Sequence, residues 1–552
     1  MKFLSKLFPV LLSIVLILGF AISTSAANID SASTSAQTQV SLLAADFEIS
    51  GTKLESDVVL PKMYSSKNLG YTTPVRDQIY NTCWAYGSSA TLESVLLKNG
   101  HKVESFAPMH MNHWGTLRED GTGWNRDYLS GGYSYISLGY FTSWQGPRLE
   151  KDYPETTPFN NFSALNATSP KQAAVNGVIY LDTGDAQSVK TAIYKYGAVV
   201  GNYHVDEENF DFDNNAYYCN TKGLATSQLN GHCISIVGWN DDYSKNNFIP
   251  GAQPKNNGAW LCKNSWGKNW GNNGYYWISY EDEYLFDTRF GHSYTFTDYE
   301  LYDSTKTIYQ NEVDGATYEF EYISNFDTLT YINVFDTDTS ANKIERVNFE
   351  STSEDASYII YNIPVDSSTG TPSRTRSKWT QIGSGTIDHQ GYITVDTTDF
   401  TVTSNKFAIG ISITKQNGSN NSIGVSEWLT TGSKYIFKPQ SKHGQSYIHY
   451  GTSTLTDVMD FYSDYYNDDI GGTFVIKAIG TQDIIIGDTD LDGRLSILDA
   501  TAIQRYLAQL EDFNLEQKKN ADYDNDGLIS IFDATLIQVK LVSTVTDFED
   551  FE

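Results

Sequence analysis

The chain has 552 residues, and at roughly 100 to 200 residues per domain this length predicts three or four folded units rather than one small module. Apolar residues make up 40% of the sequence and charged residues 19%, which is enough to bury sizeable cores and excludes a chain that is disordered throughout. The formal charge of −29 opposes binding to phosphate backbones and anionic lipid, so nucleic acid is excluded as a general partner. Four cysteines are too few for a disulfide-built scaffold, so each thiol needs its own explanation.

Residues 1–27 have the features of a secretory signal peptide. Lys2 and Lys6 precede an apolar run at 7–22, and the small residues that follow suit a cleavage site. The run is short for a spanning helix, and no other segment approaches the roughly 20 apolar residues that a bilayer core requires. We therefore expect a secreted, extracellular product without a membrane segment after cleavage; an uncleaved anchor is the alternative. Residues 28–56 are weakly patterned and are expected to be a linker or short leader.

The segment 57–296 is predicted to be an α+β domain. A helical pattern at 83–98 ends at Asn99 and Gly100, a good helix stop. Strand-like apolar runs follow at 197–205, 232–239, 259–266 and 274–280. Helix first and strands later is typical of α+β folds.

The segment 297–481 is predicted to be an all-β sandwich. Short alternating runs lie at 317–323, 392–397, 407–414 and 473–480, separated by turn-forming residues. Its placement and its last strand resemble the lectin-like domain of secreted bacterial proteins. Its aromatic residues could stack on carbohydrate, but aromatic residues in strands are more often core, so no ligand residue is assigned.

Cys83 opens the expected helix at 83–98, and that position predicts a reactive thiol. The unpaired N–H groups and the positive dipole at a helix N-terminus favour thiolate over thiol. The backbone N–H of Cys83 and the side-chain amide of Gln78 could stabilise the oxyanion that forms when the sulfur attacks a carbonyl. Cys83 is therefore the candidate nucleophile for acyl transfer.

A thiol nucleophile needs a group that carries its proton. Of the nine histidines, only His232 lies in a strand pattern suited to holding an imidazole rigidly. Asn264 can orient that ring through its amide oxygen, and Trp266 can shield their hydrogen bond from water. Cys83, His232 and Asn264 thus form a candidate triad.

Four motifs occur in chain order around these residues. They are Q-x4-C-W-A at 78–85, LSGGYSY at 129–135, GH-x5-GW at 231–239 and KNSWG-x2-WG at 263–271. Together they resemble the papain family of cysteine peptidases over about residues 60–294. The resemblance implies a two-lobed fold, with Cys83 on one lobe and His232 and Asn264 across a cleft. It also implies that Gly131 and Gly132 bind an extended peptide through their backbones.

The chain departs from the family pattern in three places. The spacing from Gln78 to Cys83 is one residue shorter than usual and contains no cysteine, which puts the oxyanion loop in question. His232 and Asn264 are 32 residues apart, more than in papain, so residues 241–258 are expected to form an inserted loop bordering the cleft. The long helical inhibitory propeptide of the family is also missing from the region after the signal.

The other notable side chains of this domain are expected to be structural. Cys219, Cys233 and Cys262 lack the spacing of a zinc site and are expected to be core thiols without disulfides. His204 and Trp270 are likewise expected to pack in the core rather than to contact substrate.

The segment 482–545, followed by an acidic tail at 546–552, contains an internal repeat. Stretches at 488–499 and 522–533 place carboxylates at positions one, three, five and twelve, with glycine at six and a backbone carbonyl at seven. Hard oxygen ligands in this order predict one Ca²⁺ per repeat, because the clustered carboxylates would otherwise repel one another. The expected ligand residues are Asp488, Asp490, Asp492, Arg494, Ser496, Asp499, Asp522, Asp524, Asp526, Leu528, Ser530 and Asp533.

Each loop precedes one helix with the pattern A-T-x-I-Q, an arrangement that resembles a dockerin, a small α-helical module that attaches enzymes to the cohesins of cellulosome-type scaffolds. The resemblance implies that cohesin contacts the tenth and eleventh loop positions. These are Ile497 and Leu498 in the first repeat, and Ile531 and Phe532 in the second. Their similarity implies that either repeat could dock. The alternative is that Ile497 and Ile531 are core residues between the two helices.

The sequence as a whole predicts a secreted cysteine endopeptidase that carries a calcium-dependent dockerin and needs no cofactor for catalysis. The alternative, favoured by the short oxyanion loop, is a catalytically silent papain-like module that binds peptide or assembles complexes. Transglutaminase-like enzymes also use Cys and His, but they normally complete the site with Asp rather than with an Asn-Ser-Trp-Gly motif.

Overall fold

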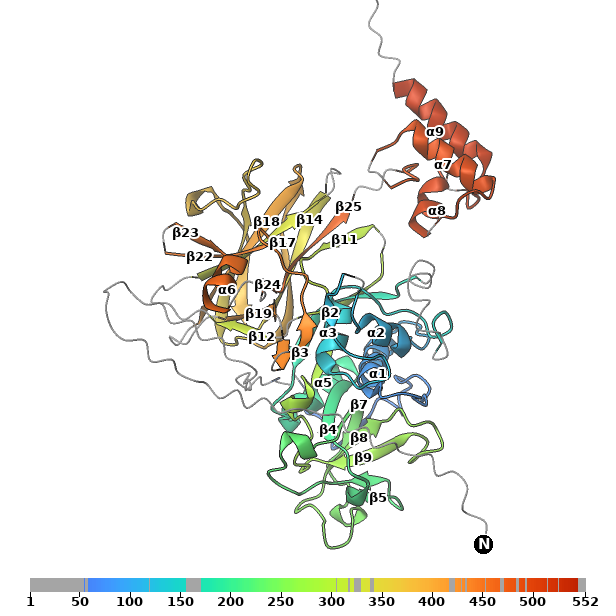
Figure 1. The fold of residues 1–552 in the computed structure, drawn as a ribbon. Coiled ribbons are helices and arrows are strands. Elements are labelled where there is room, and N and C mark those ends of the chain that lie inside the picture. The colour runs from blue at the N-terminus through green and yellow to red at the C-terminus, as the bar shows by residue number, and fades with distance from the viewer. Residues whose placement is uncertain are drawn as a thin grey trace, which may run out of the picture.

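The structure is a computed structural model of the chain (Figure 1). The predicted signal peptide and nearly all of the predicted linker lie outside the residues it describes. Among the described residues, no helix combines the length and the apolar character needed to cross a bilayer. The described residues are 54, 58–118, 120–154, 170–303, 305–315, 318–321, 329–337, 342–415, 422–427, 429–431, 434–451, 453–466, 471–482, 486–491, 494–513, 515–524 and 526–544.

The first lobe of the N-terminal body is helical and is built around α1 (Cys83–Lys98), whose bounds match the sequence prediction. All residues from 84 to 96 are buried, so this helix is the centre of the lobe. Gly100 follows the helix with a φ of +84°, a conformation that glycine adopts without a Cβ penalty. Two helices that the sequence pattern did not predict, α2 (Pro108–Trp114) and α3 (Ser134–Thr142), pack against α1.

The second lobe is a largely antiparallel sheet. Four of its strands match the four predicted apolar runs: β4 (Val199–His204), β7 (Gly231–Asn240), β8 (Ala259–Lys263) and β9 (Tyr275–Ser279). The remaining strands are β1 (Met63–Ser65), β3 (Ala173–Tyr180), β5 (Phe210–Asp211), β6 (Ala216–Tyr217) and β10 (Tyr294–Leu301). Helix α5 (Ala186–Tyr196) packs against β4, β7 and β10; its N-cap Asp185 accepts the Ser188 N–H.

The middle body is a sandwich of two antiparallel layers, with additional short strands and one helix. One layer holds β11 (Lys306–Tyr309), β25 (Ile476–Gln482), β14 (Asn342–Ser351) and β17 (Gly391–Val402). The other holds β16 (Thr380–Ile387), β15 (Ala356–Ile363), β18 (Lys406–Lys415), β13 (Leu329–Asp336), β22 (Ser446–Tyr450) and β23 (Thr454–Asp457). The further elements are β12 (Tyr318–Glu321), β19 (Ser422–Glu427), β24 (Gly472–Phe474), β20 (Leu429–Thr431), β21 (Lys434–Lys438) and helix α6 (Val458–Tyr466). Apolar side chains from both layers form one core, as expected for a sandwich.

The sheet lobe and the sandwich are continuous, which the sequence did not predict. Strand β17 pairs with β3, with Gly391 opposite Ile179 and Tyr392 opposite Val178, so a single sheet runs through both bodies. A second connection pairs β2 (Gly123–Trp124) of the helical lobe with β21. Strand β10 itself crosses the predicted domain boundary at residue 296. The N-terminal body and the sandwich are therefore one structural unit.

A buried ion pair reinforces this junction. Lys477 of β25 lies 2.9 Å from Glu312, and both side chains are at most 2% exposed. The Lys477 ammonium also donates to the carbonyl of Thr142 and the hydroxyl of Ser143 at the end of α3. Because these contacts involve both bodies, the position of the helical lobe depends on the sandwich.

The C-terminal body contains the three helices α7 (Ile497–Leu507), α8 (Leu515–Ala521) and α9 (Ile531–Thr544). Helices α7 and α9, one from each sequence repeat, pack against each other around a small core that includes Ile503 and Ile537. Figure 1 shows this body beside the sandwich, as a separate group of helices.

Replacement of Lys477 by Met should lower the free energy of unfolding by about 3–5 kcal/mol, because Glu312 is then left as a buried charge without its cationic partner. Lys343→Met is the control: Lys343 pairs with Asp399 where both side chains are about half exposed, and its loss should cost less than about 1 kcal/mol. Chemical denaturation of the two full-length variants measures the difference. Equal losses would contradict a structural role for the buried pair.

Candidate functional site

The packing of α1 on β7 brings the predicted nucleophile to the strand of the predicted base. Cys83 is the first residue of α1, and His232 is the second residue of β7. A Cβ atom on Gly87 would lie 2.9 Å from the Cys233 sulfur and 3.1 Å from the backbone nitrogen of Ile234. Only glycine permits this approach of helix to strand. The backbone N–H of Cys233, next to His232, reaches the Cys83 sulfur as a result.

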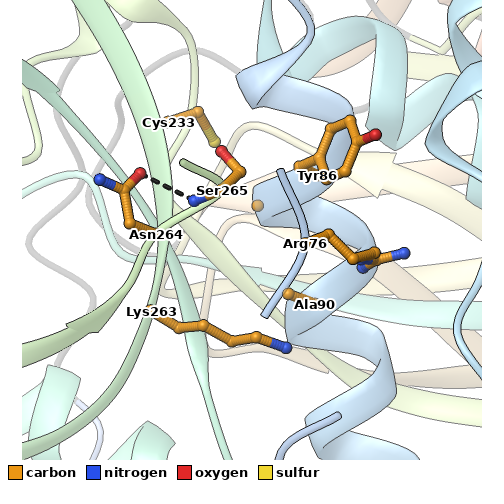
Figure 2. Close-up of a pocket in the computed structure, with 8 residues that line it drawn as sticks. Arg76, Tyr86, Ala90, Cys233, Lys263, Asn264 and Ser265 are labelled. Atoms are coloured by element: carbon orange, nitrogen blue, oxygen red, sulfur yellow. Dashed lines mark hydrogen bonds between the residues drawn. The ribbon is translucent and has the colours of Figure 1, made fainter. Parts of the chain in front are cut away.

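The hydrogen bond between His232 and Asn264 identifies the tautomer of the imidazole. Nε2 of His232 lies 2.8 Å from Oδ1 of Asn264, and the same oxygen accepts the backbone N–H of Ser265 at 2.8 Å (Figure 2). A backbone N–H is always a donor, so the shared acceptor is the amide oxygen and His232 donates through Nε2–H. Nδ1 is then the unprotonated nitrogen, which can accept a proton.

Aromatic rings cover this hydrogen bond. Trp266, which was predicted to shield this bond, stacks on the His232 ring with 4.5 Å between centroids. Trp270 packs edge-on against Trp266 at 4.9 Å, which agrees with the expectation that it is a packing residue. Tyr203 of β4 meets the imidazole edge-on at 5.7 Å and was not predicted. His204 is buried and accepts a backbone N–H, as expected of a structural histidine.

Burial shifts both proton-carrying groups toward their neutral forms. It raises the pKa of the Cys83 thiol, although backbone N–H groups of Cys233, Trp84 and Cys83 itself oppose this shift. Burial also lowers the pKa of His232 to about 4, against the opposing effect of the hydrogen bond to Asn264. Removing water from the sulfur outweighs the N–H groups around it, so burial opposes the thiolate that the helix N-terminus was expected to favour.

Gln78 is held between the segment that leads to Cys83 and the segment that follows Asn264. Its side-chain N–H₂ donates to the Tyr80 carbonyl at 2.8 Å, and its side-chain oxygen accepts the Ser265 hydroxyl at 2.5 Å. Its amide thus lies within the site, but one of its N–H groups is already engaged.

Gly131 and Gly132 lie in the loop before α3. Gly132 lies against the indole of Trp84, where a Cβ atom would come within 2.6 Å of the ring. Throughout the described part of the chain, no hydrogen bond engages the backbone N–H or C=O of Gly132. A backbone of this kind can bind an extended peptide.

A charged cluster behind the site was missed by the sequence reasoning. Lys263, the residue before Asn264, is 4% exposed and donates to the Thr73 hydroxyl at 2.9 Å. Thr73 bonds to Glu93 of α1, and Arg76 pairs with Glu93 at 3.0 Å. Burial lowers the pKa of Lys263 to about 8. The available signal was Glu93, the single carboxylate in the helical pattern at 83–98. The adjoining pocket is lined by Arg76, Tyr86, Gly87, Ala90, Cys233, Lys263, Asn264 and Ser265 (Figure 2).

Two further expectations can be compared with the structure. Cys219, Cys233 and Cys262 are buried thiols, as predicted for core residues, whereas Cys83 is partly exposed. The inserted segment 241–258 follows Asn240, at the end of β7 opposite to His232. The expectation that this insertion borders the site is therefore wrong.

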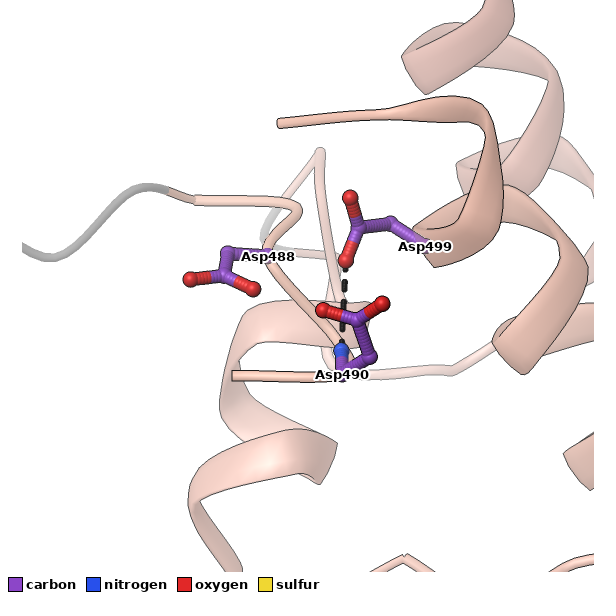
Figure 3. Close-up of side chains that lie close together, drawn as sticks. All are labelled: Asp488, Asp490 and Asp499. Atoms are coloured by element: carbon purple, nitrogen blue, oxygen red, sulfur yellow. Dashed lines mark hydrogen bonds between the residues drawn. The ribbon is translucent and has the colours of Figure 1, made fainter. Parts of the chain in front are cut away.

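Carboxylates converge in both predicted calcium loops. Oxygen atoms of Asp488, Asp490 and Asp499 lie within 4.8 Å of one another (Figure 3). Asp522, Asp524 and Asp533 form the equivalent group in the second repeat. Three hard oxygen ligands at this spacing fit a calcium ion. Asp492 lies outside the described residues.

The position-twelve carboxylates anchor the two loops in the same way. Asp499 accepts the backbone N–H groups of Thr489, Asp490 and Ser496. Asp533 accepts those of the equivalent residues Tyr523, Asp524 and Ser530. The Asp526 side chain accepts the N–H of Leu528, so it orders the loop, whereas Arg494 and Leu528 are exposed. This repetition shows that the two loops share one architecture.

The predicted cohesin-binding side chains are on the surface. Ile497, Leu498, Ile531 and Phe532 are each between 55% and 59% exposed. The alternative interpretation, in which Ile497 and Ile531 belong to the core between the helices, is therefore wrong. The core is filled instead by residues one turn further along, such as Ala500 and Ala534.

Comparisons with known proteins agree with this architecture. Sequence profiles match a papain family cysteine protease at residues 60–291, a lectin-like domain at 308–479 and a dockerin type I domain at 486–542. Cathepsin K of Gallus gallus is 27% identical over 216 residues, which are 39% of this chain and 58% of the relative. Cathepsin L2 of Homo sapiens is 24% identical over 223 residues, with coverages of 39% and 60%. The chain thus spans less than two thirds of these relatives.

Two solved structures match the protease and sandwich together. The cysteine protease and lectin-like domains of Cwp84, a surface layer associated protein of Clostridium difficile, are 32% identical with a TM-score of 0.68 and cover 78% of this chain and 90% of that one. Cwp84 after propeptide cleavage is 32% identical with a TM-score of 0.67, covering 76% and 99%. The chain therefore belongs to the papain family of cysteine proteases, with a lectin-like domain and a dockerin after the protease domain.

The pKa of His232 predicts the acid limit of any activity. We expect kcat/KM to fall as the pH drops through about 4, because Nδ1 is then already protonated and cannot accept the Cys83 proton. The lowered pKa thus extends activity toward acid. Initial rates on a fluorogenic peptide across the acid range measure this limit. An acid limb near the ordinary histidine value of 6.5 would contradict the assignment.

Proposed function

We propose that this chain is a secreted cysteine endopeptidase whose dockerin attaches it to a cohesin-bearing scaffold. The observation that carries the peptidase proposal is the pair of His232 and Asn264, with Nδ1 left as acceptor, on the strand against which the Cys83 helix packs. The resemblance to cathepsins and Cwp84 supports it. Extracellular location is supported by the predicted signal peptide and by the surface-layer association stated for Cwp84.

In the proposed reaction, the Cys83 sulfur attacks the peptide carbonyl while Nδ1 of His232 takes the thiol proton. The backbone N–H of Cys83 and the amide of Gln78 hold the resulting oxyanion. His232 then gives the proton to the leaving amine as the C–N bond breaks, and a thioester remains. His232 activates water to hydrolyse this thioester, and Asn264 keeps the ring oriented throughout.

Proton transfer during attack agrees with the electrostatics of the site. Burial favours the neutral thiol and the neutral imidazole, so the mechanism does not require an ion pair of Cys83 thiolate and His232 imidazolium in the free protein. The backbone of Gly132, which makes no hydrogen bond within the described part of the protein, supports binding of an extended peptide substrate.

One observation favours the alternative of a catalytically silent peptide-binding module. An N–H of Gln78 is engaged by the Tyr80 carbonyl, so this residue must rearrange or use its second N–H to contact an oxyanion. The alternative predicts peptide binding without turnover.

Cys83→Ala should abolish both hydrolysis of a fluorogenic peptide and labelling by a thiol-directed peptidyl inhibitor, since it removes the nucleophile. Cys219→Ala, which removes a buried thiol, is the matched control and should retain both. The assay is run under reducing conditions with labelling read by mass spectrometry. A wild-type protein that binds peptide but is neither active nor labelled would establish the silent alternative.

The dockerin is proposed to hold two calcium ions, one per loop, and to bind cohesin through one of its two similar faces. The two carboxylate clusters and the four exposed apolar side chains support this proposal. Carbohydrate is a candidate ligand of the sandwich, but several of its described aromatic side chains, such as Tyr331, Tyr392 and Tyr462, are buried in the core.

Calcium titration of the full chain should give two sites, and Asp533→Asn should leave one, because position twelve both ligates the ion and anchors the loop. Asp512→Asn changes an exposed carboxylate outside the loops and should leave both sites. Calorimetry measures the stoichiometry, and cohesin capture is compared with and without a chelator. Capture that persists without calcium would contradict the loop assignment.

A further inference from the structure

The side chain of Arg126 bonds to the loop that carries Gly131 and Gly132. This residue follows β2, and its guanidinium donates all five of its N–H groups to oxygen atoms. The acceptors are the carbonyls of Asn112 (3.1 Å), Gly115 (3.0 Å), Ser130 (2.6 Å) and Gly131 (3.0 Å) and the side-chain oxygen of Asn112 (2.8 Å).

These acceptors belong to two separate segments. Asn112 and Gly115 lie at the C-terminal end of α2, where unpaired carbonyls and the helix dipole favour a cation. Ser130 and Gly131 belong to the loop before α3. The guanidinium thus joins the loop to a helix of the rigid lobe. Burial lowers the pKa of Arg126 to about 10, so it remains charged at neutral pH.

The same side chain connects the loop to the nucleophile. The Arg126 guanidinium lies over the Trp84 ring, 5.3 Å from its centroid, and Trp84 directly follows Cys83. Gly132 packs so closely against that ring that a Cβ atom would not fit between them. Arg126 therefore fixes the distance between the Gly132 backbone and the start of α1.

We propose that Arg126 is a positioning residue for substrate. It holds the Gly131–Gly132 backbone in the position from which that backbone can bind an extended peptide next to Cys83. This inference rests on the proposed peptidase function. Arg126 does not touch the reacting atoms. Its loss should weaken peptide binding in the ground state and in the transition state alike, and should leave the Cys83–His232 pair intact.

Arg126→Lys tests the proposal, because an ammonium cannot span five acceptors on two segments. We expect KM for a fluorogenic peptide to rise roughly tenfold, the effect of losing one to two hydrogen bonds, with kcat changed less than about threefold. Alkylation of Cys83 by iodoacetamide, a small reagent that needs no peptide backbone, should stay at the wild-type rate. Arg505→Lys on the exposed surface of α7 is the matched control and should change none of these values.

Asn112→Ala is the second variant if Arg126→Lys does not fold. It removes one acceptor of the guanidinium and should raise KM in the same direction by a smaller factor. An unchanged KM in folded variants overturns the positioning role. A parallel fall in kcat and in the rate of alkylation by iodoacetamide overturns it as well. Failure of the peptidase proposal is distinguishable, because the wild-type protein itself would then show no turnover.

Discussion

The close contact between α1 and β7 is the constraint on which the site depends. The two lobes supply different parts of the chemistry, and only the approach at Gly87 brings the Cys83 sulfur to the strand of His232. On the sheet side, Asn264 and Trp266 fix the imidazole in one tautomer and exclude water from it. Burial in this contact shifts the pKa of both groups toward their neutral forms, which agrees with a proton transfer from Cys83 to His232 when the substrate is attacked.

The position of the helical lobe also depends on contacts with the sandwich, which follows the protease domain in the sequence. Strand β17 extends the sheet of the protease, β21 pairs with β2, and Lys477 fastens the end of α3 through buried polar contacts. Arg126 follows β2, and its hydrogen bonds hold the loop of Gly131 and Gly132 against this lobe. The sandwich is therefore a structural support of the helical lobe. The match to Cwp84 covers both domains together, in agreement with this dependence.

The sequence predicted those features that are carried by local patterns. Helix α1, the four strands of the sheet lobe and the two carboxylate loops each follow from periodicity or spacing within a short segment. The features that the sequence did not predict depend on contacts between residues that are distant in the chain. Burial under β7 raises the pKa of the Cys83 thiol, and the cluster of Lys263 and Glu93 joins residues far apart in sequence. Arg126 could not be identified because four of its five acceptors are backbone carbonyls, which any residue supplies.

The most direct test of the account is the alkylation rate of each of the four cysteines in native protein, compared between wild type and His232→Ala. Mass spectrometry after timed exposure to iodoacetamide resolves the four sites. The account predicts that Cys83 reacts fastest in the wild type and slows strongly without the imidazole, while the three buried thiols stay protected in both. Equal Cys83 rates in the two proteins would contradict the claim that His232 serves this sulfur.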